Sequence, residues 1–189
     1  MRSRRTRRAG GTRLSIPNLI TLGRIILVPI VVWAIMSGEM RAAFFLFLAA
    51  GISDAVDGFL AKRFHMASEL GAYLDPLADK ALLISIYVAL ALIGALWPAL
   101  TILVVSRDLM IMFAVLVSWL LANPVEIRPA RISKLNTAVQ IAFAAFVLAA
   151  KAFGFDASAA QPAFTLIVAA STLASGGVYV AYWLHHMTD

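Results

Sequence analysis

Long apolar stretches, separated by short polar segments, run along most of the chain. Each stretch holds about 20 residues, the length of an α-helix that crosses the roughly 30 Å hydrocarbon core of a bilayer. Residues that break helices stand between the stretches: Ser37-Gly38, Trp97-Pro98, Asn123-Pro124, Gly154 and Pro162. The pattern predicts helices at about residues 17–37, 42–62, 72–94, 97–122, 132–152 and 161–185. We therefore expect an all-α integral membrane protein, built as one bundle of six transmembrane helices.

The composition supports a membrane protein and excludes several kinds of site. Of the 189 residues, 62% are hydrophobic and 14% are charged, and the mean hydropathy is +0.89. These values lie outside the range of soluble domains. Cysteine is absent, which excludes a disulfide framework, a thiolate nucleophile and a cysteine metal site. The three histidines, His65, His185 and His186, are placed so that no zinc site is expected.

A basic segment precedes the first predicted helix. The stretch MRSRRTRRAGGTR contains six arginines and no acidic residue. Such a segment suits anionic lipid headgroups or nucleic acid, or it only fixes the orientation in the membrane. A signal peptide is a further alternative, but Arg24 interrupts the apolar run that follows, and Pro17 and Pro29 bracket it. We expect a cytoplasmic tail at residues 1–14 with no nucleic-acid partner, and a six-helix membrane domain at residues 15–189.

Positive charge is distributed unevenly over the predicted loops. With a cytoplasmic N-terminus, the segments on the same side carry the first arginines and these further cations: Lys62, Arg63, Arg128, Arg131 and Lys134. The opposite side carries Arg41 and Lys151. Because Lys and Arg accumulate on the cytoplasmic side of membrane proteins, we expect the N-terminus there. The lack of a cleavable targeting segment favours a bacterial inner membrane over a mitochondrion.

Four aspartates interrupt the second and third predicted helices. Asp54 and Asp57 are three residues apart, and Asp75 and Asp79 are four apart, so each pair projects from one face of its helix. The expected topology brings both pairs together at the cytoplasmic side. Two carboxylates about 4 Å apart repel by roughly 4 kcal/mol at an effective dielectric constant near 20. The cluster therefore needs compensating positive charge.

A pair of divalent cations would supply that charge. Carboxylate oxygens suit magnesium, calcium or manganese, and two such ions form the usual clamp for displacement at phosphorus. Alternatively, some aspartates are helix caps or ion-pair partners of nearby cations, which are Lys62, Arg63 and Lys80. Ionisable groups inside a membrane usually mark function. Gly58 and Gly71 lie beside the two pairs, where they would let a ligand approach the backbone closely.

The whole stretch resembles a known family motif. It reads Asp54-x-x-Asp57-Gly58-x-x-Ala61-Lys62, then eight residues, then Gly71-x-x-x-Asp75-x-x-x-Asp79. This is similar to the signature of the CDP-alcohol phosphotransferase family, with every spacing kept. The family pattern has arginine at the position of Lys62, which loses the planar fork that holds a phosphate through two bonds. Arg63, next to it, is a candidate to compensate.

The resemblance implies six membrane helices, a homodimer, and transfer of a phosphatidyl group from a CDP-linked lipid to an alcohol with release of CMP. Asp54, Asp57 and Asp75 correspond to metal ligands, and Asp79 to a metal ligand that is also the general base. The expected cofactor is a pair of Mg²⁺ or Mn²⁺ ions. The positions that match contacts to the CDP-lipid are Asn18, Thr21, Gly58, Lys62 and Ser68. Gly71, which lies beside the second aspartate pair, is expected to belong to the same binding site. For Asn18, a helix cap is an equal alternative.

Flanking segments bear on the acceptor alcohol. SIPNLITLGRI, LDPLADKALLISIYVAL, VSRDLMI and ISKLNTAVQ resemble the cardiolipin synthase branch of the family. Phosphatidylglycerophosphate synthases tend to have a second lysine where this chain has Asn136. Loss of that cation fits a singly charged phosphodiester better than glycerol 3-phosphate. We therefore expect CDP-diacylglycerol and phosphatidylglycerol as substrates, with cardiolipin and CMP as products, and keep glycerol 3-phosphate as the alternative acceptor.

Charged residues beyond the motif are candidates to bind the acceptor. Arg107 lies deep in the fourth predicted helix, next to Asp108, where a charged residue usually has a function. Arg107, Arg131 and Lys134 are expected to contact the acceptor's phosphate. An ion pair of Arg107 with Asp108 or with a motif aspartate is an equal alternative. A cation or proton transporter would also use buried aspartates, but that hypothesis leaves the motif glycines and the fixed spacer unexplained.

Overall fold

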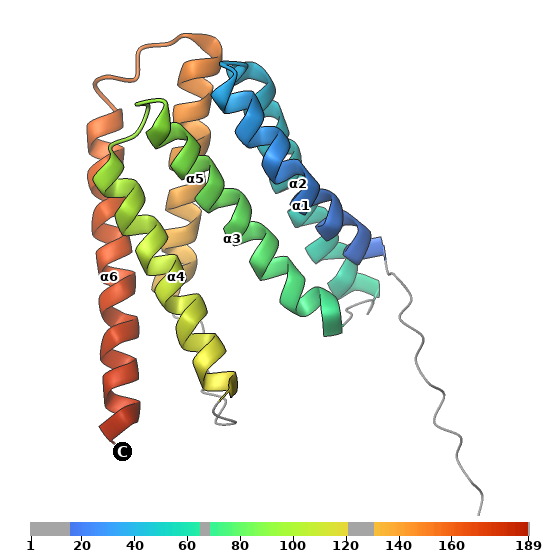
Figure 1. Ribbon diagram of the computed structural model, residues 1–189, viewed down its shortest axis with the longest axis vertical. Helices are drawn as coiled ribbons and strands as arrows, with labels where there is room; N and C mark the ends of the chain where they lie inside the picture. Colours follow the sequence, from blue (N-terminus) through green and yellow to red (C-terminus); the bar gives the residue numbers. More distant parts are fainter. Residues whose placement is uncertain (1–15, 65–68, 121–130, 189) are drawn as a thin grey trace, which may run out of the picture.

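The computed structural model describes the backbone of residues 16–64, 69–120 and 131–188, and the side chains of residues 21–56, 77–113 and 132–181. Its described part consists of six α-helices (Figure 1): α1 (Ile16–Met36), α2 (Met40–Phe64), α3 (Glu69–Leu92), α4 (Pro98–Leu120), α5 (Arg131–Phe153) and α6 (Gln161–Thr188). The predicted all-α class is therefore confirmed, and each predicted helix is present with ends that differ by a few residues.

Glycines in a left-handed conformation follow two of the helices. Gly38 and Gly94 follow α1 and α3 with φ of 79° and 73°, a left-handed conformation that costs glycine little. At each turn the next amide reaches back to the helix, with Glu39 N 2.9 Å from Ala34 O and Ala95 N 2.8 Å from Leu90 O. These bonds form Schellman motifs, so α1 and α3 end abruptly and the chain reverses direction.

Within the described residues, two helices are long and apolar enough to cross a membrane by length and composition, over Ile132–Phe153 and Gln161–Ala181. A shorter apolar helix covers Thr21–Met36. Large apolar side chains also lie on the outside of the bundle, such as Leu166 at 71% exposure and Phe113 at 67%. An apolar surface of this kind suits contact with lipid. The six-span topology stays a prediction.

The core lies where α3 passes between its neighbours. α3 packs against α1, α4 and α5, while α5 also packs against α2 and α6. Ile86, Tyr87 and Leu90 of α3 are fully buried, together with Phe143 and Leu148 of α5. Successive helices run in opposite directions (Figure 1), so the start of α1, the end of α2 and the starts of α3 and α5 lie at the same end of the bundle. This end carries the motif.

Candidate active site

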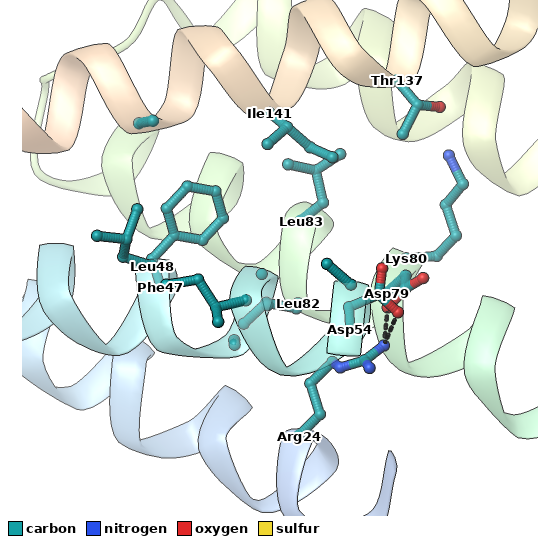
Figure 2. A pocket seen from close by; sticks show the side chains of 15 residues that line it. Arg24, Phe47, Leu48, Asp54, Asp79, Lys80, Leu82, Leu83, Thr137 and Ile141 are labelled. Atoms are coloured by element: carbon teal, nitrogen blue, oxygen red, sulfur yellow. Dashed lines mark hydrogen bonds and ion pairs between the residues drawn. The ribbon is translucent and has the colours of Figure 1, made fainter. Parts of the chain in front are cut away.

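A cavity of about 510 Å³ lies between α1, α2, α3 and α5, within the roughly 300–1,000 Å³ typical of ligand sites. Figure 2 shows that its polar side chains gather at one end and its apolar side chains at the other. The polar end comprises Arg24, Asp54, Asp79, Lys80 and Thr137. The apolar walls include Phe47, Leu48, Leu83, Ile141 and Ala145. The cavity therefore has the polarity of a lipid headgroup joined to an acyl chain.

At the polar end, two motif aspartates meet on one arginine. Arg24 Nη1 of α1 lies 2.8 Å from Asp54 Oδ1 of α2 and also forms an ion pair with Asp79 of α3. The Arg24 side chain is 1% exposed, whereas the two carboxylates are 47% and 44% exposed. We call Arg24, Asp54 and Asp79 the acidic cluster. One aspartate of each pair is thus brought together on Arg24, although the described residues of α2 and α3 do not pack directly against each other.

The other motif residues lie on the same helices. Asp57 follows Asp54 by one turn of α2, and Asp75 precedes Asp79 by one turn of α3. The helical backbone thus preserves the spacing on which the four-aspartate prediction rests. The side chains of several predicted site residues lie outside the described part of the structure: Asn18, Asp57, Gly58, Lys62, Gly71, Asp75 and Arg131. Ser68 lies outside it altogether.

The donor set of the acidic cluster fits hard divalent cations. Two carboxylates from different helices converge on one cationic group, and both residues line the cavity with side chains that are 47% and 44% exposed. Magnesium and manganese prefer such oxygen ligands. No group of three or more metal-ligating side chains gathers among those that the structure describes; Asp57 and Asp75 are the residues that would enlarge the set.

Thr21 lies apart from the lining of this cavity. It lies on α1 one turn before Arg24, is fully buried, and is not among the residues that line this cavity. Its contact with the nucleotide stays a prediction.

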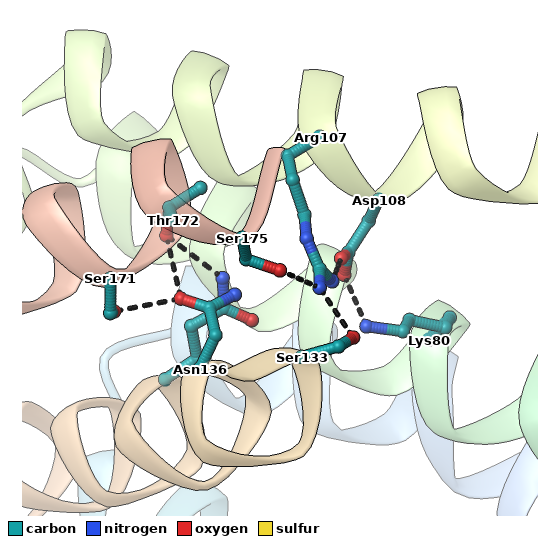
Figure 3. Close-up of polar contacts among 9 residues, drawn as sticks. Lys80, Arg107, Asp108, Ser133, Asn136, Ser171, Thr172 and Ser175 are labelled. Atoms are coloured by element: carbon teal, nitrogen blue, oxygen red, sulfur yellow. Dashed lines mark hydrogen bonds and ion pairs between the residues drawn. The ribbon is translucent and has the colours of Figure 1, made fainter. Parts of the chain in front are cut away.

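A second group of charges, drawn in Figure 3, is joined to the cavity through Lys80. Lys80 Nζ of α3 donates to Asp108 Oδ2 at 2.8 Å, and Arg107 Nη1 of α4 donates to Asp108 Oδ1 at 2.6 Å. Asp108 has 0% exposure and Arg107 has 4%. Arg107 Nη2 also donates to Ser133 Oγ of α5 at 2.6 Å and to the Ser175 hydroxyl of α6. We call Lys80, Arg107 and Asp108 the buried cluster.

The buried cluster contains one of the two alternatives expected for Arg107. The ion pair with Asp108 is confirmed, and the guanidinium also lies over the Tyr179 ring at 5.9 Å. Arg107 does not line the cavity described above. Lys134 is exposed near the start of α5. The role of Arg107, Arg131 and Lys134 in binding the acceptor stays a prediction.

The argument from Asn136 needs correction. Asn136 has 0% exposure, and its Oδ1 accepts hydrogen bonds from Ser171 at 2.7 Å and from Thr172 at 3.0 Å, both on α6. Its neighbour Thr137, about 100° further around the helix, lines the cavity instead. Asn136 therefore joins α5 to α6. Its side chain does not line the cavity, so it is not placed to contact the charged group of an acceptor there.

Sequence reasoning missed the partners of Arg24 and Lys80. In the sequence, Arg24 stands out only because it interrupts an apolar run, and Lys80 is a candidate partner of the motif aspartates. The available signal was the rule that an ionisable residue within a membrane segment has a partner. In the structure, Arg24 pairs with motif aspartates and Lys80 pairs with Asp108.

Comparisons with known proteins agree with the motif. The family model for CDP-alcohol phosphatidyltransferase matches residues 14–183. The chain is 34% identical over 182 residues to a cardiolipin synthase (CMP-forming) / mitochondrial hydrolase fusion protein of Schizosaccharomyces pombe, covering 87% of this chain and 30% of that protein. It is 33% identical over 184 residues to the cardiolipin synthase (CMP-forming) of Rattus norvegicus, covering 89% of this chain and 61% of that protein.

A third relative is named for a different acceptor, glycerol 3-phosphate. The chain is 33% identical over 182 residues to CDP-diacylglycerol--glycerol-3-phosphate 3-phosphatidyltransferase 1, chloroplastic, of Oryza sativa subsp. japonica, covering 86% of this chain and 55% of that protein. The match to the family model extends over most of the sequence and includes both halves of the aspartate motif. This chain belongs to the CDP-alcohol phosphatidyltransferase family.

Proposed function

We propose that the protein is a metal-dependent membrane enzyme that transfers the phosphatidyl group of CDP-diacylglycerol to phosphatidylglycerol, giving cardiolipin and CMP. The observation that carries the proposal is the convergence of Asp54 and Asp79, from α2 and α3, at the polar end of a cavity with apolar walls. Family membership supports the transfer chemistry and disfavours the transporter hypothesis.

The chemistry is an in-line displacement at phosphorus. The acceptor hydroxyl attacks the phosphorus that carries the diacylglycerol, a new P–O bond forms, and the bond to the CMP oxygen breaks. Asp79 accepts the proton of the attacking hydroxyl as general base. Two Mg²⁺ or Mn²⁺ ions, held by Asp54, Asp57, Asp75 and Asp79, would neutralise charge on the diphosphate. Arg24 holds two of these carboxylates together and so keeps Asp79 at the site of attack.

The membrane and the remaining site residues have supporting roles. Acyl chains of a lipid substrate fit the apolar walls of the cavity, so that the protein positions chiefly the headgroup. Asn18, Thr21, Gly58, Lys62, Ser68 and Gly71 are proposed to bind the CDP-lipid. We further propose six membrane spans, a homodimer, and a cytoplasmic active site, in a bacterial inner membrane. The distribution of Lys and Arg over the loops supports the orientation.

Phosphatidylglycerol is favoured as the acceptor on two grounds. The cavity joins its polar end to apolar walls, which suits an acceptor that carries acyl chains, and the fission-yeast and rat relatives are named cardiolipin synthases. Glycerol 3-phosphate is the second candidate, because the rice relative is named for that acceptor.

The test is an acceptor assay with the purified protein. In mixed micelles with Mg²⁺ and CDP-diacylglycerol, we expect CMP release when phosphatidylglycerol is added, and loss of release when a chelator removes the metal. Release with glycerol 3-phosphate alone would select the second candidate. Release with neither acceptor would contradict the proposed function.

A further inference from the structure

Lys80 connects the cavity with the buried cluster. It directly follows Asp79 on α3, but adjacent residues of a helix point about 100° apart, and Figure 2 shows its side chain extending toward α5, where Thr137 lies. Its Nζ forms the 2.8 Å ion pair with Asp108, and 23% of its side chain remains exposed. Lys80 also lines the cavity. The ammonium group is thus held by Asp108 on a side chain that also lines the cavity.

The buried cluster has more positive than negative charge. Asp108 is a single carboxylate shared between Lys80 at 2.8 Å and Arg107 at 2.6 Å, so the three side chains together carry one net positive charge. Arg107 and Asp108 are almost completely buried, at 4% and 0% exposure. Lys80 is the member of this cluster that lines the cavity. An anion in the cavity would therefore contact this positively charged cluster at Lys80.

We propose that Lys80 binds the phosphate of the acceptor alcohol, an inference that rests on the proposed function. Lys80 and Asp79 are neighbours on α3, so the acceptor's phosphate would lie at Lys80 while its hydroxyl lies at Asp79. In phosphatidylglycerol and in glycerol 3-phosphate alike, one glycerol unit separates these two groups. Asp108 and Arg107 are positioning residues, because they hold the ammonium against the cavity without lining it.

The electrostatics of the two clusters favour this division of roles. The acidic cluster has two carboxylates and one guanidinium, so its net charge of one negative unit suits cations. The buried cluster has the opposite excess and suits an anion that comes without a metal. A lysine is a compact point charge with rotatable donors, adequate for a singly charged phosphodiester that makes no bidentate contact.

The decisive variant is Lys80→Met. It removes the ammonium but leaves Arg107 and Asp108 as a neutral ion pair, so the variant is expected to fold, and thermal unfolding in detergent checks this. Lys151→Met is the control, because Lys151 is an exposed cation near the opposite end of α5. CMP release is measured at varied phosphatidylglycerol with saturating CDP-diacylglycerol, and then with the two lipids exchanged.

We expect Lys80→Met to raise the KM for phosphatidylglycerol at least tenfold and to change the KM for CDP-diacylglycerol by less than threefold. Lys80→Arg should restore most of the affinity for the acceptor, and Lys151→Met should match the wild type. If the wild type uses glycerol 3-phosphate instead, the same rise is expected in the KM for that acceptor. An unchanged acceptor KM, or an equal rise in both KM values, would overturn the inference.

A binding measurement separates this inference from the proposed function. If the wild type released CMP with neither acceptor, the proposed enzyme activity would fail, and calorimetric titration with short-chain phosphatidylglycerol would still test Lys80. Binding by the wild type that is at least tenfold weaker in Lys80→Met supports the lysine as a phosphate ligand. Equal binding by the two proteins, or binding by neither, contradicts it.

Discussion

Two groups of charges lie within the same helical bundle and are exposed very differently. In the acidic cluster, the cation Arg24 is buried while the carboxylates of Asp54 and Asp79 are nearly half exposed. In the buried cluster, Asp108 is fully enclosed and the cation Lys80 is the partly exposed member. Each cluster thus buries the group that holds it together and presents the opposite charge to the cavity.

This difference indicates what each cluster can bind. An exposed carboxylate can gain a metal ion as a ligand, whereas a buried carboxylate whose oxygens are taken by Lys80 and Arg107 cannot do so without losing them. The same residue types therefore serve a binding site at the acidic cluster and a fixed support at the buried cluster. Changes in the acidic cluster should affect turnover more than stability, and changes to Asp108 should affect stability more.

The largest expected effect is on turnover in Asp79→Asn. General-base catalysis contributes about 10²–10⁴-fold, so we expect kcat to fall by about that factor, with helical content and thermal unfolding close to the wild type. Asp156→Asn is the control, because Asp156 is an exposed loop aspartate at the other end of the bundle. Wild-type turnover in Asp79→Asn would remove this residue from the role of base.

The next largest effect is on stability in Asp108→Asn. The substitution leaves Arg107 and Lys80 without their shared carboxylate, and breaking a buried ion pair costs about 3–5 kcal/mol. Thermal or denaturant unfolding in detergent measures the loss, with Asp54→Asn as the matched change at a half-exposed aspartate. Similar unfolding midpoints for these two variants would contradict the distinction between the clusters.

A smaller effect is expected for Arg24→Gln. The glutamine removes the guanidinium between Asp54 and Asp79. Because Arg24 is buried but the two carboxylates are half-exposed, we expect a loss between the roughly 1 kcal/mol of an exposed ion pair and the about 3 kcal/mol of a buried one. Mg²⁺ should stabilise this variant more than it stabilises the wild type, because the ion replaces the missing charge. Unfolding midpoints with and without Mg²⁺ test this, and an equal shift in both proteins would count against a metal site at the acidic cluster.

The smallest effect is expected for Ser171→Ala. This change removes one of the two hydroxyl groups that donate to Asn136 Oδ1 and leaves Thr172. The net value of one such hydrogen bond is about 0.5–1.5 kcal/mol. Because Asn136 joins α5 to α6 and does not line the cavity, the KM for either acceptor should not change. A change in acceptor preference would return Asn136 to the binding site.

The sequence predicted the helices and their turns well, for reasons that particular residues make clear. Gly38 and Gly154 adopt the left-handed conformation expected of breakers. In lipid, an apolar stretch between breakers forms an α-helix, because a helix satisfies its own backbone hydrogen bonds. The aspartate spacing likewise predicted that acids of the second and third helices come together, and Asp54 and Asp79 do so on Arg24. Both predictions depend on local rules that act within a turn or a helix.

The failures concern which neighbour a helix face meets. α5 packs against α2 on one side and α6 on the other, and apolar residues cover both faces, so periodicity does not distinguish Thr137 at the cavity from Asn136 at α6. The partners of Arg24 were likewise hidden, because 55 positions separate it from Asp79. Such pairings are set by tertiary packing, which a single sequence does not reveal.

The most direct test of the central claim is Mn²⁺ binding, followed by electron paramagnetic resonance, in the wild type and in Asp54→Asn/Asp79→Asn. The account predicts two bound Mn²⁺ ions per chain in the wild type and loss of binding in the double variant, with helical content unchanged in both. Equal Mn²⁺ binding by the two proteins, or none by the wild type, would contradict the claim that the exposed carboxylates of α2 and α3 form a divalent-metal site.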